Sequence, residues 1–274
     1  MKKISILGCG WLGLPLAKAL IEKGNSVNGS TTSEDKLSIL ENSGINPFLV
    51  TLESESVSES INEFLAESEI LIIDIPPKLR GNNPDSEKKV FVEKITNLIP
   101  FIEKSTVKKV LFVSSTSVYG NENELITEET KPNPDTESGK QLLLAEAVLQ
   151  NNPNFETTIL RFGGLIGEDR QPVKHLAGKE NLENPDAPVN LIHQNDCISI
   201  ILEILNQSKW NAVFNAVAPF HPSRSDYYSQ KAIELNLELP KFSSEKSNIK
   251  KLISSEKVET VLKYKFQLQN YQTT

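Results

Sequence analysis

The sequence has little of what disulfide-bonded, metal-binding or membrane-spanning proteins need. It holds two cysteines, Cys9 and Cys197, far apart and outside any CxxC or Cys/His pattern, so we expect reduced thiols in a cytoplasmic protein. Its three histidines show no metal-ligand spacing, and we predict no metal site. No apolar run approaches the roughly 20 residues that cross a bilayer, and the first residues lack the apolar segment of a signal peptide, so we expect no membrane partner.

Dense positive charge is also missing. The net charge is −7, without a Lys/Arg stripe, and binding of many backbone phosphates requires such a stripe, so we predict no nucleic-acid partner. The GxSxG motif of serine hydrolases is absent as well. The negative net charge does not exclude a small anionic ligand, because such a ligand needs only a local pocket.

What is present is a regular alternation of short apolar runs and helical patterns. A chain of 274 residues can bury roughly 75% of its unfolded surface without disulfide or metal. The alternation predicts an α/β fold, a Rossmann-type doubly wound parallel sheet. The expected strands are 3–8, 25–30, 46–50, 69–77, 108–115 and 157–162, and the expected helices are 12–24, 33–44, 58–67, 86–104 and 134–151.

The alternation loosens after Arg161, where Gly, Pro, Asn and charged residues accumulate. We expect residues 1–165 to form the dinucleotide-binding domain and residues 166–274 a smaller substrate-side lobe that returns elements to the main sheet. In this lobe we predict strands at 188–192 and 211–217, helices at 196–207 and 225–237, and one more helix in the tail. The acidic loop 121–137 is interpreted either as a lid or as a solvated connection.

A glycine-rich turn follows the first predicted strand and opens the first predicted helix. In GxGxxG, the first glycine allows the tight turn, the second lets the backbone approach a diphosphate, and the third lets helix and strand pack closely. The helix start adds unpaired N–H groups and partial positive charge. The other interpretation is a turn without a ligand. The predicted cofactor-binding residues here are Gly8, Cys9, Gly10, Trp11, Leu12 and Gly13.

The end of the second predicted strand bears on the choice of cofactor. NAD-binding proteins usually place Asp or Glu there to hold the ribose 2′-hydroxyl. Here Thr31, Thr32 and Ser33 offer neutral hydroxyls that can donate hydrogen bonds to a 2′-phosphate, and Lys36 can add charge. We therefore expect NADP, with NAD as the alternative. Thr32 or Ser33 can also be the N-cap of the next helix, and both roles can hold together.

Further stretches resemble a known family. VLFVSSTSVYG, residues 110–120, resembles the fifth strand of extended short-chain dehydrogenases/reductases, the NAD-dependent epimerase/dehydratase group. LRFGGLIG, residues 160–167, resembles the sixth strand and the turn beside the nicotinamide. PVNLIHQND, residues 188–196, resembles a later strand and helix cap, and we expect Asn195 or Asp196 to be the N-cap of the helix that follows. Together with GCGWLG, GEDRQP and HPSRSDYY, these stretches are most similar to an atypical bacterial subgroup, and the resemblance covers essentially the whole chain.

The resemblance implies roles for individual residues. It gives Ser115 and Tyr119 as catalytic candidates, with packing as the other role of Tyr119. Arg170 and His193 are candidates for binding the substrate, although a solvent-facing arginine and a satisfied histidine are equally ordinary. Arg161 is expected to be structural or near a phosphate. The further residues that the resemblance places beside the cofactor are Ile75, Pro76, Ser114, Phe162 and Gly163.

The family's Tyr-x-x-x-Lys pair is missing. Aligned on Glu146, its two positions hold Ser138 and Leu142, and neither can pass a proton or bind ribose as the pair does. A two-residue shift would recover Lys140 but no tyrosine, and Lys140 is better interpreted as a solvated helix residue.

Two functions therefore stay open. One is an NAD(P)-dependent oxidoreductase or epimerase-like enzyme acting on a small sugar-like or nucleotide-linked substrate. The other is a non-catalytic NADP(H)-binding sensor or scaffold that has lost this chemistry. Relatives often form homodimers through helices beside the active site. The apolar helix face at residues 142–149 is compatible with that, and equally with packing on the sheet.

Overall fold

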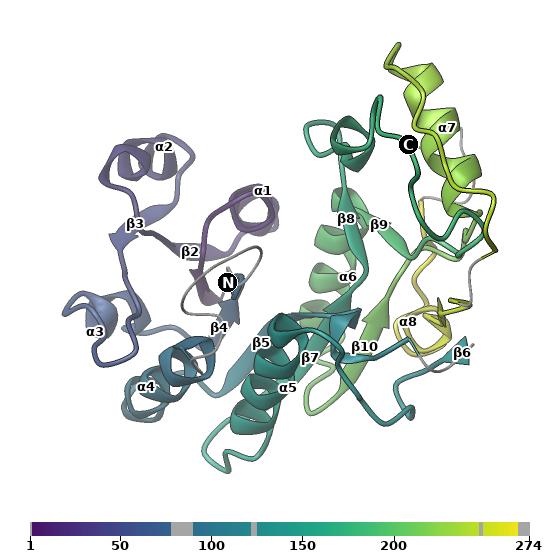
Figure 1. Cartoon of the computed structure of the whole chain (residues 1–274). Helices are drawn as coiled ribbons and strands as arrows, with labels where there is room; N and C mark the ends of the chain where they lie inside the picture. Colours follow the sequence, from purple (N-terminus) through teal and green to yellow (C-terminus); the bar gives the residue numbers. More distant parts are fainter. Residues whose placement is uncertain (1, 78–89, 122–124, 247–248, 268–274) are drawn as a thin grey trace.

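A seven-stranded, wholly parallel sheet forms the centre of the molecule (Figure 1). The computed structural model describes residues 2–77, 90–121, 125–246 and 249–267. The strand order is β3-β2-β1-β4-β5-β7-β10, which confirms the expected doubly wound α/β fold. The strands are β1 (Lys3–Leu7), β2 (Ser26–Thr31), β3 (Asn46–Leu49), β4 (Ile70–Ile73), β5 (Lys109–Ser115), β7 (Glu156–Phe162) and β10 (Val213–Ala216).

Helices cover both faces of the sheet (Figure 1). They do so because apolar side chains of its strands contribute to two hydrophobic clusters. One hydrophobic cluster holds the apolar faces of α1 (Gly13–Glu22), α2 (Leu37–Asn42) and α6 (Gln194–Asn206). The other holds those of α3 (Ile61–Leu65), α4 (Val90–Lys104) and α5 (Glu137–Gln150).

Several predicted helices differ in extent from those in the structure. The helix expected at 33–44 is divided into a 3-10 turn, η1 (Glu34–Lys36), and α2. Of the helix expected at 86–104, the part up to residue 89 lies outside the described residues. In α5 the apolar face packs inward as the spacing predicts, with Leu142, Ala145 and Leu149 at most 4% exposed. A homodimer stays a prediction.

The second half of the chain adds two short parallel pairs beside the main sheet. β8 (Gly164–Ile166) pairs with β9 (Leu191–His193), and β6 (Leu125–Ile126) pairs with β11 (Leu252–Ile253). The strand predicted at 188–192 therefore begins later and joins β8. The remaining elements are the 3-10 turns η3 (Thr116–Val118) and η4 (Pro172–His175), and the helices α7 (Arg224–Glu234) and α8 (Glu256–Val261).

The start of α6 corrects a sequence interpretation. Asn195 or Asp196 was the expected N-cap, but the cap is His193, whose Nδ1 accepts the Asn195 N–H at 3.2 Å. Asp196 is fully buried instead, and its Oδ1 accepts hydrogen bonds from the Tyr264 hydroxyl at 2.6 Å and the Gln267 N–H at 2.8 Å. Asp196 thus ties the C-terminal segment to α6.

Candidate functional site

The glycine turn lies at the carboxyl edge of the sheet, where the strand order reverses between β1 and β4. A methyl group at Gly8 would collide with the Asp74 carbonyl, and one at Gly13 would collide with the Gly8 carbonyl. A methyl group at Gly10 would meet nothing within 4 Å. The outer glycines thus permit close packing, while the backbone at Gly10 faces open space, which fits the approach of a dinucleotide diphosphate.

The helix start completes this phosphate-binding geometry. The first helical hydrogen bond of the turn runs from the Leu14 N–H to the Gly10 carbonyl at 3.2 Å. Trp11 and Leu12 precede that bond, so their N–H groups have no partner within the helix. Gly13 is the first residue of α1, and its N–H is directed to the Asp74 carboxyl group.

Trp11 joins the turn to the loop after β8. Its indole Nε1–H donates to Asp169 Oδ1 at 2.7 Å, and the Arg170 guanidinium lies 5.0 Å from the centre of its ring. Gln194 of α6 donates to the Trp11 carbonyl at 2.6 Å. The structure therefore brings two predicted residues together, Trp11 for the cofactor and Arg170 for the substrate, and holds Arg170 beside the cofactor turn.

Asp74 is a site residue that the sequence interpretation missed. It follows β4, across the switch point from Gly8, and its N–H donates to the Leu7 carbonyl at 2.8 Å. Burial raises the pKa of the Asp74 carboxyl group to about 8, although the Gly13 N–H and the charge of Arg170 act in the opposite direction. One sequence signal could have found it, since Asp74 is the single charged residue in the run ILIIDIPP.

The end of β2 shows how the predicted 2′-phosphate residues are arranged. Ser30 Oγ accepts the Gly8 N–H at 2.9 Å, and Thr31 Oγ1 accepts the Ser33 N–H at 3.1 Å. Thr32 and Lys36 are exposed to solvent. Ser33 is the N-cap residue of η1 by position, as one interpretation expected, but its side chain makes no capping hydrogen bond.

The turn after β5 holds the two catalytic candidates in different environments. Ser115 is half-buried, and its Oγ accepts the Ser117 N–H at 3.1 Å, which leaves the hydroxyl hydrogen for a further acceptor. Lys251, from the C-terminal segment, donates to the carbonyls of Thr116 at 3.2 Å and Tyr119 at 2.7 Å. Burial lowers the pKa of Lys251, although Asp135 opposes the shift. No sequence signal connects this lysine to the turn.

Tyr119 is 3% exposed and belongs to a buried polar network. Its hydroxyl accepts from Arg161 Nη1 at 2.6 Å and donates to Asn215 Oδ1 at 3.0 Å. Arg161 also binds Glu146 through Nε at 3.0 Å and Nη2 at 2.5 Å. Burial raises the pKa of Tyr119 against the charge of Arg161, so the phenol stays protonated at neutral pH.

Ser114, which is expected beside the cofactor, is hydrogen-bonded within the same buried network. The Ser114 hydroxyl donates to Glu146 Oε1 at 2.6 Å, and both residues are at most 5% exposed. Phe162 is 2% exposed and packs in the core, and the space beside Gly163 is filled by the Asn190 carbonyl. Their assignment to the cofactor stays a prediction.

The other predicted positions are distributed around this edge. Ile75 is half-buried against the glycine turn and Pro76 is exposed. At the positions of the family's Tyr-x-x-x-Lys pair, Ser138 is half-buried and Leu142 is 4% exposed. Lys140 is exposed, as expected for a solvated helix residue.

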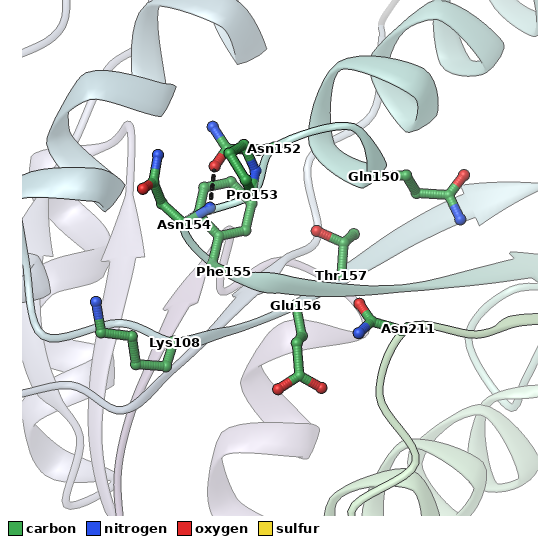
Figure 2. Close-up of a pocket in the computed structure, with 9 residues that line it drawn as sticks. All are labelled: Lys108, Gln150, Asn152, Pro153, Asn154, Phe155, Glu156, Thr157 and Asn211. Carbon is green, nitrogen blue, oxygen red and sulfur yellow. Dashed lines mark hydrogen bonds between the residues drawn. The ribbon is translucent and has the colours of Figure 1, made fainter.

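A separate hollow of about 680 Å³ lies at the amino edge of the sheet (Figure 2). It is lined by residues at the starts of β5 and β7 and the end of α5, among them Lys108, Gln150 and Glu156. Figure 2 shows polar side chains around an open surface, without a glycine turn or any predicted site residue. Ligands of doubly wound sheets bind at the carboxyl edge, so we place the functional site there.

Comparisons with known proteins show the family of the chain. The model of a family described as NAD(P)H-binding matches residues 8–207. Protein YeeZ of Escherichia coli K12 is 35% identical over 269 residues, covering 97% of this chain and 96% of YeeZ. The expected similarity to an atypical bacterial subgroup is thereby confirmed, since YeeZ represents that subgroup.

Solved structures share the fold at low sequence identity. UDP-glucuronic acid 4-epimerase of Bacillus cereus, in complex with UDP-glucuronic acid and NAD, superimposes with a TM-score of 0.81 at 18% identity, over 97% of this chain and 95% of that one. A conserved protein of unknown function from Silicibacter pomeroyi gives a TM-score of 0.79 at 21% identity, over 99% and 96% of the two chains.

We predict that Glu146→Leu lowers the free energy of unfolding by about 3–5 kcal/mol, because it leaves the Arg161 charge buried without its partner. The double variant Glu146→Leu/Arg161→Met should recover at least half of the loss. Glu156→Gln, which breaks the half-exposed pair with Lys109, serves as the control and should cost under about 1 kcal/mol. Urea unfolding measures all three, and a loss below about 1 kcal/mol in Glu146→Leu would contradict the prediction.

Asp74 should make stability depend on pH. Its pKa rises from 3.8 to about 8 on folding, so between these values the folded state binds more protons than the unfolded state, and stability falls as pH rises. The difference in thermal stability between Asp74→Asn and the wild type should therefore grow in favour of the variant from about pH 4 to pH 8. Above about pH 8 this difference should stay constant. Glu69→Gln, at the other end of β4, should show no such trend. An equal gap at pH 5 and pH 8.5 would refute this assignment.

Proposed function

The chain belongs to the NAD(P)H-binding family, and from this premise we propose that it is an NADP-dependent oxidoreductase or epimerase-like enzyme acting on a sugar-like or nucleotide-linked substrate. The observation that carries the proposal is the glycine turn at the switch point, with the Gly10 backbone facing open space. Asp169 and Arg170, from the second half of the chain, contact Trp11 of this turn, which supports a ligand beyond the cofactor.

The substrate class is supported by structural relatives. The Bacillus cereus epimerase holds UDP-glucuronic acid with NAD, and MoeE5, with a TM-score of 0.78, holds UDP-glucose with NAD. Both share the fold of this chain at under 25% identity, and their ligands are the basis for proposing a nucleotide-linked sugar as the substrate class. The guanidinium of Arg170 lies beside Trp11 of the cofactor turn, and a positive charge at this place fits an anionic ligand.

The chain's own residues define a limited chemistry. A bound nicotinamide would accept or return a hydride. Ser115 offers a hydroxyl hydrogen at the carboxyl end of β5 and can orient a substrate carbonyl or hydroxyl. Tyr119 follows Ser115 by four residues, and its protonated phenol accepts a hydrogen bond from Arg161. Tyr119 is the candidate proton donor. Lys251 fixes the turn between them as a positioning residue.

A second candidate function is a non-catalytic NADP(H)-binding sensor or scaffold. The observation that favours it is the pair of positions at the start of α5, where Ser138 and buried Leu142 replace the family's tyrosine and lysine and Lys140 points to solvent. Bound NADPH that no carbonyl compound oxidises would favour this candidate.

Turnover of NADPH with a panel of carbonyl compounds and nucleotide-linked sugars tests the proposed activity. We expect turnover with at least one compound and a loss of roughly 10²–10⁴-fold in Tyr119→Phe if the phenol transfers the proton. Ser115→Ala should lower turnover in the same assay without changing NADPH affinity. Unchanged turnover in Tyr119→Phe would assign that residue to the buried framework, and unchanged turnover in both variants would refute the proposed site.

The preference for NADP is tested by titration. We expect NADPH to bind more tightly than NADH, because the end of β2 offers hydroxyls and Lys36 rather than a carboxylate. Lys36→Gln should weaken NADPH binding by about 2- to 5-fold, the effect of one exposed charge, and leave NADH binding unchanged. Lys18→Gln, an exposed lysine on α1, is the matched control. Tighter binding of NADH by the wild type would show that the preference is wrong.

A further inference from the structure

Asp74 occupies a place where a negative charge conflicts with the ligand. Its carboxyl group accepts the N–H of Gly13, the first residue of the ten-residue helix α1. Its backbone carbonyl packs against Gly8, where a methyl group would collide with the carbonyl oxygen, so the backbone of Asp74 is held beside the turn. The N–H groups of this helix start are the donors that the family uses for cofactor phosphates. An ionised Asp74 would therefore repel the diphosphate from its own binding site.

Among the residues that the structure describes, Arg170 is the cation whose charge acts on Asp74. Cys9 lies in the turn and Cys197 in α6, and burial raises the pKa of both thiols, to about 12 for Cys9, so both stay neutral. From the loop after β8, Arg170 acts on Asp74 with its positive charge. The carboxylates on that loop are Glu168 and Asp169, both exposed, and Asp169 accepts the Trp11 indole N–H.

We propose that the cofactor diphosphate binds when Asp74 is neutral, so that binding takes up a proton and weakens at alkaline pH. A neutral carboxyl group has one O–H that can donate to a phosphate oxygen, while its other oxygen keeps the Gly13 N–H. An ionised carboxylate is an acceptor only and offers the phosphate nothing. The inference rests on dinucleotide binding, which family membership shows, and is independent of the proposed reaction.

The free protein is already prepared for this proton uptake. Burial holds the pKa of Asp74 near 8, so the neutral form predominates at pH 7 and the ionised form at pH 9. If the neutral form alone binds, linkage makes NADPH affinity about tenfold weaker at pH 9 than at pH 7. The phosphates of NADPH keep their charge across this range, because their last pKa values lie near 6.

Titration of the full-length protein with NADPH, followed by cofactor fluorescence from pH 7 to pH 9, provides the first test. We expect the tenfold loss in the wild type and a flat profile in Asp74→Asn, whose amide mimics the neutral acid with an oxygen for Gly13 and an N–H for phosphate. Glu69→Gln is the matched control, since Glu69 immediately precedes β4 as Asp74 immediately follows it, and should keep the wild-type slope.

Calorimetry gives a second readout that does not depend on the affinity. In buffers of different ionisation enthalpy at pH 9, the wild type should take up nearly one proton per NADPH and Asp74→Asn none. Arg170→Gln should move the midpoint of the wild-type pH profile upward, because the arginine charge lowers the pKa of Asp74.

Three outcomes would overturn the inference: a wild-type affinity that is constant from pH 7 to pH 9, a slope that persists in Asp74→Asn, or no proton uptake at pH 9. Thermal unfolding of each variant verifies that it is folded at both pH values. Because no step measures turnover, a failure of the proposed reaction would leave these results unchanged.

Discussion

The buried ion pair between Glu146 and Arg161 is the interaction on which the carboxyl half of the sheet depends. It joins α5 to β7, and through Ser114 and Tyr119 it also reaches the end of β5 and the turn that follows. Removing two charges from water costs several kcal/mol each, and this cost is offset only where the remaining hydrogen-bonding capacity is used. Here both carboxylate oxygens are used, so the pair fixes geometry more than it adds stability.

This pair also determines what Tyr119 can do. A phenol between a guanidinium and the Asn215 amide is held in one orientation, and any proton it gives must pass through a packed site. The Asn215 Nδ2 group has no hydrogen-bond partner among the described residues, and leaving such a group unpaired costs about 1–3 kcal/mol. The Tyr119 hydroxyl is thus held in place by Arg161 and Asn215 despite this cost. Such a fixed hydroxyl suits both a proton donor and a structural tyrosine.

Local patterns were enough to predict the fold and the glycine turn, because both depend on neighbours in sequence. The run ILII is apolar on both faces and becomes β4, and GCGWLG sets its own turn and helix start. The contacts of Arg170 and Lys251 could not be predicted, since Trp11 is 159 positions before Arg170 and Tyr119 is 132 before Lys251. His193 replaced the expected cap because imidazole Nδ1 can accept an N–H just as an Asn or Asp oxygen does.

The second half of the chain supplies positive charge to the site, although its irregular sequence shows no pattern that predicts this role. The protein carries a net charge of −7, yet its ligand is a polyanion. Arg170 reaches the cofactor turn and Lys251 reaches the turn after β5, and both come from the part of the chain after β7. Cations placed this close to low-dielectric walls act more strongly than the net charge, which solvent screens beyond about 8 Å. This part of the chain therefore contributes to the electrostatics of the site as well as its shape, and at Asp74 the charge of Arg170 opposes the rise in pKa that burial causes.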